Sequence, residues 1–480
     1  MKKLLALISL ACLLLPLPAS AQEKFRRQPP LPDPLPTLTL PEIEDHTLAN
    51  NLRLRVAHKT GFPVINLSLV VLTGESMSPD AKPGLATFTA NMVSRGSDNF
   101  SASEVQETID NIGGRFTTQT NPDYTIFSLS CLQENLDHAL ELLSDMLVRP
   151  SFSRRQIEDL QRVTFYDLTR KREDPEFSGK KLLYQLLFRD HVYQKIVYND
   201  NIIRTYTLGD IRGFYENFYR PDNTILVITG DIDLNQASRK VSRNFNTWEK
   251  GTVGKVSLTA PVLDATQSIC FLQIPRAKDI NIFMGTLIPP KTNEDFFSLG
   301  VLNQVLGGTY ISRLFMNLRE SKGYAYDAAF SYMEFYRVCG VFYVHARVTP
   351  ESIRSAIDEI RREIRIISTQ RVPNEEIETA KSYLLGRYPM GIQTHEDLSA
   401  RIADVQALGL SDGHWDKYYE NITRIDSRSV YEAAQRHSLL TPIIIIVGDR
   451  SVLETIGYEK IDVYNSNGEL VQSVTKGVRQ

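Results

Sequence analysis

The stretch Ile225-Leu-Val-Ile-Thr-Gly-Asp231 has a close counterpart at Ile443-Ile-Ile-Ile-Val-Gly-Asp449. Each is an apolar run that ends in Gly-Asp, a pattern typical of a buried strand followed by a turn. Gly230 and Gly448 are 218 residues apart, and Asn66 and Asn281, in a second pair of matching runs, are 215 residues apart. Offsets that agree this closely predict two structural repeats of about 200 residues, a period far too long for a solenoid.

Within each repeat, strand-like runs are interleaved with long amphipathic helices. The first repeat predicts strands at 52–57, 64–72, 115–119 and 124–131, and helices at 84–95, 133–147 and 153–187, the last interrupted near Asp174-Pro175. The second repeat has matching helices at 294–306 and 351–367 and a strand at 341–348. This order predicts an α+β layer fold in each half. We expect an N-terminal domain at 41–250, a C-terminal domain at 263–460 and a tail at 461–480.

The chain begins with the pattern of a bacterial secretory signal peptide. Lys2-Lys3 supply positive charge, Leu4 to Leu15 form an apolar run too short to span a bilayer comfortably, and Ala19-Ser-Ala21 offers a cleavage site. We expect residues 1–21 to be the signal peptide and residues 22–40 to be a proline-rich linker. The mature protein should then be exported to the periplasm without a transmembrane segment. The alternative is an uncleaved N-terminal anchor.

The composition is that of an ordinary globular protein. The 480 residues carry a formal net charge of −3 with no dominant basic patch or acidic tail, which argues against a nucleic-acid partner. After removal of the signal, Cys131, Cys270 and Cys339 are too few and too widely spaced for a disulfide framework, with one bridge left open as an alternative. None of the eight histidines lies three or four residues from another, so no histidine pair predicts a metal site.

The helix at 84–95 carries the most informative motif. The run Gly84-Leu-Ala-Thr-Phe-Thr-Ala-Asn-Met92 resembles the active-site helix of the M16 metallopeptidases, the family of pitrilysin and the mitochondrial processing peptidase. Active members read G-L-A-H-F-L-E-H-M there, with the inverted zinc motif H-x-x-E-H. The resemblance covers about residues 45–455 and implies two similar α+β domains, each an antiparallel sheet with helices packed on one face. Thr87, Ala90 and Asn91 stand at the His, Glu and His positions.

These three residues cannot supply the zinc chemistry of the motif. A catalytic zinc site needs three protein ligands and a bound water, and the Glu of the motif takes a proton from that water. Thr87 is at best a weak ligand, Ala90 cannot act as a base, and Asn91 has no imidazole. The resemblance places the third ligand on Asp167, 76 residues after Asn91, within Gln161-Arg-Val-Thr-Phe-Tyr-Asp-Leu168. Asp167 alone would not hold zinc, so we expect no metal in this chain.

The second repeat retains another feature of the family's active site. The run Arg313-Leu-Phe-Met-Asn-Leu-Arg319-Glu-Ser-Lys-Gly-Tyr-Ala-Tyr326 resembles the C-terminal M16 motif, in which Arg and Tyr seven residues apart face the active site. By that resemblance, Arg319 and Tyr326 hold the substrate backbone and help polarise the scissile carbonyl, a role that suits two hydrogen-bond donors. The alternative is that both residues are retained for packing. On the substrate-binding strand of the first repeat, Thr117-Thr118 replace the usual Asn-Ala pair.

The loss of the zinc ligands with retention of the Arg/Tyr pair resembles the non-catalytic subunits of the family. Some M16 pairs consist of one chain with H-x-x-E-H and one chain with Arg and Tyr but no zinc. The resemblance therefore predicts the non-catalytic subunit of a heterodimeric zinc metallopeptidase. Such a subunit binds peptide or unfolded polypeptide and assists a zinc-bearing H-x-x-E-H partner through Arg319 and Tyr326. Two alternatives remain open: a stand-alone peptide-binding or scaffold protein without proteolytic activity, and an enzyme with an unrecognised site.

Overall fold

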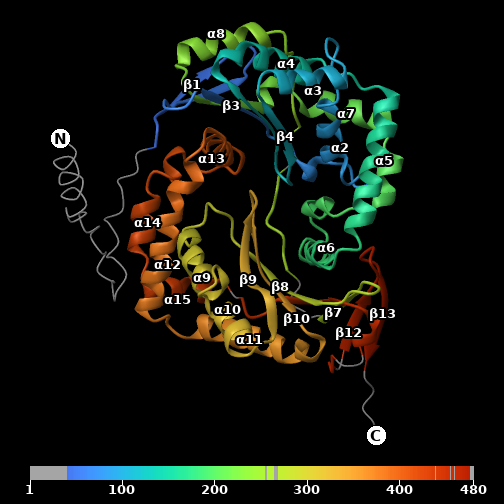
Figure 1. Cartoon of the computed structure of the whole chain (residues 1–480), viewed down its shortest axis with the longest axis vertical. Helices are drawn as coiled ribbons and strands as arrows, with labels where there is room; N and C mark the ends of the chain where they lie inside the picture. Colours follow the sequence, from blue (N-terminus) through green and yellow to red (C-terminus); the bar gives the residue numbers. More distant parts are fainter. Residues whose placement is uncertain are drawn as a thin grey trace, which may run out of the picture. The chain divides into compact units, whose positions relative to one another are not determined.

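The computed structural model describes residues 40–475, except 255–256, 264–268, 438, 454–455 and 459. The expected signal peptide, and the expected linker up to residue 39, lie outside these residues. Two β-sheets, one in each half of the chain, organise the part that is described (Figure 1). The predicted pair of α+β domains is confirmed. None of the described helices combines the length and the apolar character needed to cross a membrane.

The N-terminal half contains a six-stranded sheet in the order β1-β2-β6-β3-β5-β4. Its strands are β1 (Ile43–Thr47), β2 (Arg53–His58), β3 (Val64–Val71), β4 (Arg115–Thr120), β5 (Thr125–Leu132) and β6 (Thr224–Gly230). Strands β2 and β6 run parallel, whereas the other neighbours run antiparallel. We expected an antiparallel sheet, and the parallel pair β2–β6 is the exception. Strand β6 returns to the sheet after a long helical excursion rather than a hairpin, and only such a connection can place it parallel to its neighbour.

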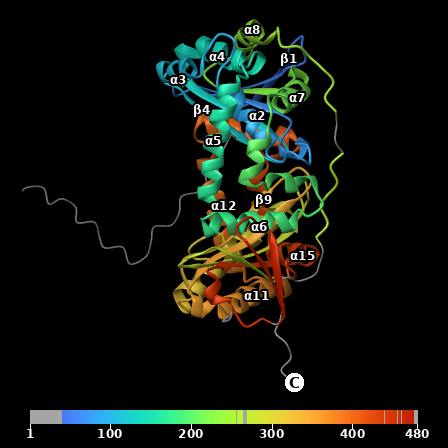
Figure 2. The ribbon, with the colours of Figure 1, turned by 90° about the vertical axis from the view of Figure 1, so that its right-hand side faces the viewer.

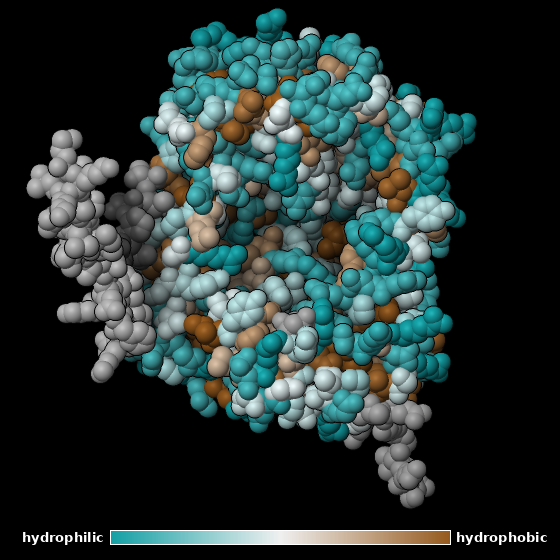
Figure 3. Space-filling model, in the orientation of Figure 1, coloured by the Kyte–Doolittle hydropathy of each residue, from teal (hydrophilic) through white to brown (hydrophobic). Residues whose placement is uncertain are grey.

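Most helices of this half pack on one face of the sheet. They are α2 (Leu85–Val93), α3 (Ala102–Asn111), α4 (Leu136–Val148), α5 (Arg154–Lys171), α7 (Leu208–Phe218) and α8 (Leu234–Phe245). Ser101 and Ser153 begin α3 and α5 with complete capping boxes, which satisfy backbone N–H groups at each helix start. Hydrophilic residues predominate on the outer sides of α3, α4 and α8 (Figure 3). These helices are thus amphipathic, with the apolar side towards the sheet.

The C-terminal half contains a seven-stranded sheet in the order β13-β12-β7-β11-β8-β10-β9. Its strands are β7 (Ile269–Gln273), β8 (Ile280–Ile288), β9 (Ala325–Phe335), β10 (Gly340–Val348), β11 (Ile443–Gly448), β12 (Lys460–Tyr464) and β13 (Leu470–Thr475). Strand β7 runs parallel to both β11 and β12, so this sheet is mixed as well. Residues 461–475, expected to be a tail, instead form most of the two outer strands. Ile461 and Val463 are buried in the core, which explains why this segment joins the sheet.

The helices that cover one face of the second sheet come from the C-terminal half. They are α9 (Phe296–Gly307), α10 (Arg313–Phe315), α11 (Ile353–Thr369), α12 (Asn374–Arg387), α14 (Tyr418–Arg424) and α15 (Ser427–Arg436). The opposite face is covered by α6 (Pro175–Leu187), which belongs to the N-terminal half (Figure 2). Asp174 caps this helix and Pro175 occupies its first turn, so the break predicted in the 153–187 stretch is confirmed.

A second helix makes the reciprocal crossing. Helix α13 (His395–Ala407) follows α12 in the chain but packs its apolar residues against β3 and β6 of the first sheet. Each sheet is therefore covered on both faces, with one helix supplied by the other half, which corrects the expectation of helices on one face only. Polar contacts add to this interlock: Tyr124 Oη donates to Asp404 over 2.9 Å, and the backbone N–H of Arg337 donates to Asp123 over 2.8 Å. The described residues consequently form one compact unit.

Candidate functional site

Thr87, at the first position of the altered zinc motif, is hydrogen-bonded to a buried carboxylate that caps helix α2. Glu75 lies in the short 3₁₀ turn η1 (Glu75–Met77) and is 2% exposed. Its carboxylate accepts hydrogen bonds from the backbone N–H groups of Gly84 (3.1 Å) and Thr87 (2.8 Å), and from the hydroxyls of Ser78 (2.8 Å) and Thr87. Burial raises the pKa of Glu75. The Thr87 side chain is therefore committed to an internal hydrogen bond.

The residues at the other two positions of the motif, Ala90 and Asn91, lie in surroundings that differ from those of Thr87. Ala90 is fully buried in the core of the N-terminal half. Asn91 is half-buried and lines a cavity of about 460 Å³ together with Arg95 and Leu160. The helical spacing of 87, 90 and 91 places them on neighbouring parts of one helix, but only Asn91 reaches this cavity.

Asp167 lies on α5 and is engaged by neighbouring cations. Its carboxylate pairs with Arg170 over 3.1 Å and with Lys171 over 2.8 Å. The hydrogen bond from Lys171 is the main cause that lowers the pKa of Asp167. Asp167 therefore behaves as a solvated helix residue with local partners.

A tyrosine lies close to both remnants of the zinc site. Burial is the main cause that raises the pKa of Tyr198, and Glu75, Thr87 and Asp167 are all near enough to influence it. The structure thus brings Thr87 and Asp167 into one neighbourhood, around a phenol. A hydroxyl held by Glu75, a fully buried alanine and an ion-paired aspartate do not fit zinc. Among the described residues, no group of three or more His, Cys, Asp or Glu side chains is arranged to hold a metal.

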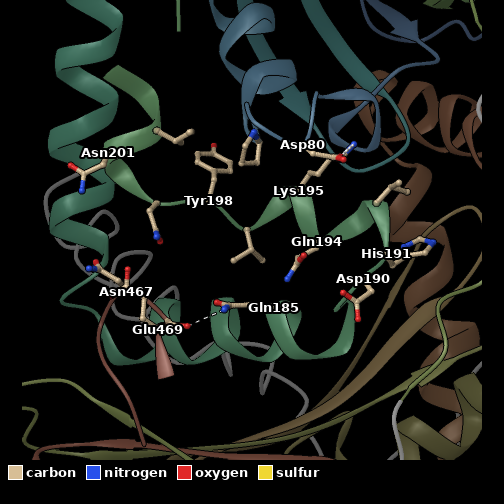
Figure 4. A pocket seen from close by; sticks show the side chains of 16 residues that line it. Asp80, Gln185, Asp190, His191, Gln194, Lys195, Tyr198, Asn201, Asn467 and Glu469 are labelled. Carbon is tan, nitrogen blue, oxygen red and sulfur yellow. Dashed lines mark hydrogen bonds and ion pairs between the residues drawn. The ribbon is translucent and has the colours of Figure 1, made fainter. Parts of the chain in front are cut away.

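Tyr198 also borders a polar cavity of about 650 Å³ (Figure 4). Its walls come from the loop before α2, from the end of α6 with the segment that follows, and from the β12–β13 turn. Lys195 pairs with Asp80 over 2.9 Å, and the Gln185 side chain donates to the carbonyl of Gly468 over 2.9 Å. The sequence could not predict this cavity, because its walls lie in three distant segments and carry no motif.

The Arg/Tyr pair of the second half is brought together at the surface. Arg319 lies in a π-helical turn, η6 (Met316–Ser321), and Tyr326 lies near the start of β9. The guanidinium carbon of Arg319 is 5.8 Å from the ring centroid of Tyr326 and 5.6 Å from that of Phe315. The Arg319 side chain is 39% exposed and Tyr326 is 79% exposed. Both donors can therefore reach a ligand, and π-helical turns are frequent at functional sites.

Arg319 differs from the nearby Arg313 in its contacts with acidic side chains. Arg313 makes a two-pronged pair with Glu376 at 2.7 and 3.0 Å, which fixes α10 to α12. Among the described residues, the acidic partner of Arg319 is the adjacent Glu320, at a longer distance of 3.6 Å. In the first half, Thr117-Thr118 lie in β4, which is the edge strand of its sheet.

Comparisons with known proteins agree with this arrangement. Residues 55–201 match the family profile described as insulinase (peptidase family M16), and residues 205–384 match the one described as peptidase M16 inactive domain. The chain belongs to peptidase family M16. The two profiles together span most of the described residues, including Thr87, Ala90, Asn91, Asp167, Arg319 and Tyr326.

Relatives of this M16 chain have low sequence identity and similar length. The uncharacterized zinc protease YmxG of Bacillus subtilis is 22% identical over 361 residues, which cover 75% of this chain and 87% of the relative. The mitochondrial-processing peptidase subunit alpha of Rattus norvegicus is 23% identical over 485 residues, which cover 92% of this chain and 91% of the relative.

Two solved structures illustrate the shared fold. A peptidase M16 inactive domain from Pseudomonas fluorescens superimposes with a TM-score of 0.78 at 18% identity, over 85% of this chain and 98% of that chain. The periplasmic protease PqqL from Escherichia coli superimposes with a TM-score of 0.70 at 17% identity, over 88% of this chain and 49% of that chain. At these identities the likeness concerns the fold alone.

Proposed function

We propose that this chain is the non-catalytic subunit of a periplasmic, heterodimeric M16-type zinc peptidase. Its partner would carry the H-x-x-E-H motif and the zinc, and this chain would contribute Arg319 and Tyr326. The observation that carries the proposal is the contrast between the two sites. At the zinc-motif positions, Thr87 is hydrogen-bonded to Glu75 and Ala90 is fully buried, whereas Arg319 and Tyr326 lie together at the surface.

The chemical role proposed for the pair is hydrogen-bond donation to a bound peptide. A guanidinium presents several N–H donors in a fixed plane, and a phenol adds one O–H donor. Donors fixed near a peptide carbonyl stabilise the negative charge that develops on its oxygen during attack by water. The pair would also hold the peptide in place, because Tyr326 begins the edge strand β9, whose outer side has no neighbouring strand among the described residues.

Two of the similar proteins support the location and the assembly. PqqL is described as a periplasmic protease, and the rat relative is described as a subunit of the mitochondrial-processing peptidase. An exported location also agrees with the signal-peptide pattern of residues 1–21. Peptide or unfolded polypeptide is the substrate class that this role requires.

The proposal is tested by activity in a reconstituted complex of this chain with its H-x-x-E-H partner. Arg319→Ala and Tyr326→Phe should each lower peptide turnover, by about 10²-fold for the loss of one oxyanion donor. The mass of the complex should remain unchanged. Arg428→Ala and Tyr383→Phe are matched controls, because both side chains are exposed on helices away from η6. Unchanged turnover in both test variants would contradict the proposed role. Peptide binding by the purified chain, with no activity gained from a partner, would favour the stand-alone binding protein instead.

A further inference from the structure

A second large cavity, of about 620 Å³, lies in the C-terminal half and is lined by residues of α9, α12, α13 and α14 and of the end of β9. Aromatic rings form much of its wall. The rings of Tyr388 and Tyr418 stack with centroids 4.1 Å apart, and those of Phe296 and Trp415 lie 6.2 Å apart. Met390, which is 67% exposed, lines the same cavity and places it in reach of solvent. An aromatic side chain of a ligand would find favourable ring contacts here.

The charged side chains that line this cavity are all cationic. Arg387 and Arg401 belong to its wall, and no aspartate or glutamate does. The guanidinium carbon of Arg401 lies 4.5 Å from the ring centroid of Trp415 and 4.8 Å from that of Tyr388. In the described part of the chain, Arg401 has no carboxylate partner. Asp404, on the next turn of α13, is bound by Lys291 over 2.5 Å and by Tyr124 over 2.9 Å.

Several polar atoms of the same wall are buried without a hydrogen-bond partner among the described residues. They are Arg401 Nε, Trp415 Nε1 and Asn303 Oδ1. Burial is the main cause that lowers the pKa of the nearby His414; the charges of Lys291 and Arg401 lower it further, and that of Asp404 raises it.

We propose that this cavity binds the C-terminal residue of a peptide, with an aromatic side chain among the rings and the free carboxylate on Arg401. An apolar pocket with an unpaired guanidinium matches both parts of such a residue. The main chain of the peptide can continue beside β9, because Met333 and Phe335 of that edge strand line the cavity. This inference goes beyond the proposed function, since it requires neither the zinc-bearing partner nor the Arg319–Tyr326 pair.

Calorimetric titration of the unaltered chain tests the proposal without any substitution. The probes are the peptide Ala-Ala-Ala-Phe with a free C-terminal carboxylate, the same peptide as its C-terminal amide, and 3-phenylpropionate. We expect the free acid to bind at least tenfold more tightly than the amide, because only the acid pairs with the guanidinium. Equal binding of acid and amide, or no binding of the acid at millimolar concentration, would overturn the proposal. Equal binding of 3-phenylpropionate and the peptide acid would overturn the assignment to a peptide.

Two variants locate the binding. Arg401→Gln should reduce the affinity for the acid to that for the amide, whereas Arg428→Gln, on an exposed arginine of α15, should leave it unchanged. Circular dichroism melts establish that both variants are folded. The sequence contains two tryptophans, and Trp248 is buried in the N-terminal half, so Trp248→Phe leaves Trp415 as the sole fluorescent reporter. Addition of the peptide acid should then change the emission. Unchanged emission, or full affinity in Arg401→Gln, would place the peptide elsewhere and overturn the proposal.

Discussion

Thr87 of helix α2 is hydrogen-bonded inside the fold, whereas Arg319 of the turn η6 and the nearby Tyr326 are exposed. At α2, the Thr87 hydroxyl bonds the buried Glu75 carboxylate, and Ala90 is fully buried. At η6, Arg319 and the ring of Tyr326 lie together, and Tyr326 is 79% exposed. A side chain this exposed contributes little to packing, so the fold gives no reason to retain it. Thr87 and Ala90 thus contribute to the hydrogen bonding and packing of the domain, whereas the Arg319 and Tyr326 side chains are accessible to a ligand.

Rebuilding the zinc motif should produce the largest effect on stability. In the triple variant Thr87→His/Ala90→Glu/Asn91→His, the new carboxylate replaces a fully buried methyl group, at a cost of about 3 kcal/mol or more. The first substitution also removes the Thr87 hydroxyl from Glu75. We expect a lower melting temperature that zinc does not raise.

The double variant Thr87→His/Asn91→His, without the buried carboxylate, is the control for this experiment. Its melting temperature should fall less than that of the triple variant. If the triple variant bound one zinc per chain and melted higher with zinc than with a chelator, the site would be only three substitutions from function. Our interpretation that packing and hydrogen bonding at Thr87 and Ala90 prevent zinc binding would then be wrong.

The second prediction concerns the pH dependence of the Glu75 cap. Because burial raises the pKa of Glu75, the folded state holds this proton more tightly than the unfolded state does. The associated stability is fully present below the ordinary pKa of 4.5 and is lost as the pH rises through the higher folded value. Glu75→Gln should lower the free energy of unfolding by about 1–2 kcal/mol at low pH, because hydrogen bonds are lost. The decrease should be smaller at neutral pH.

Urea unfolding of both proteins at pH 4, 5.5 and 7 measures this difference. The gap in unfolding free energy between the unaltered chain and Glu75→Gln should narrow as the pH rises. A gap that widened with pH would mean that the folded state prefers the charged carboxylate. That result would reverse the assigned direction of the pKa shift.

The smallest effect is expected at Asp167. Its partners Arg170 and Lys171 lie on the same exposed helix face, where ion pairs are screened by solvent. Asp167→Asn should change the unfolding free energy by less than about 0.5 kcal/mol and leave the peptide turnover of the complex unaltered. A loss of turnover comparable to that in Arg319→Ala would show that this remnant of the zinc site still serves the reaction.

Local sequence patterns predicted the local parts of this molecule well. The break at Asp174-Pro175 depends on adjacent residues, and the structure contains it between α5 and α6. The closeness of Arg319 and Tyr326 also follows from a short segment, since one turn joins the π-helical residues to β9.

Features made by distant segments were not predictable in this way. The amphipathic pattern of α6 and α13 requires an apolar neighbour but does not specify which sheet provides it, so the exchange of helices was missed. The capping of α2 by Glu75 depends on a carboxylate from another element. Both large cavities are lined by segments that lie far apart in the chain. Such contacts are set by tertiary packing, which leaves no periodic signal in the sequence.

The proposal that this chain works beside a zinc-bearing M16 partner can be tested directly. The most direct measurement is affinity isolation of the tagged protein from its native host, with mass spectrometry of the co-purifying chains and a zinc assay of the complex. We expect an equimolar complex with a chain that contains H-x-x-E-H, and zinc equal in amount to that chain. Recovery of this protein alone or only with further copies of itself, free of zinc, would contradict the proposed heterodimer.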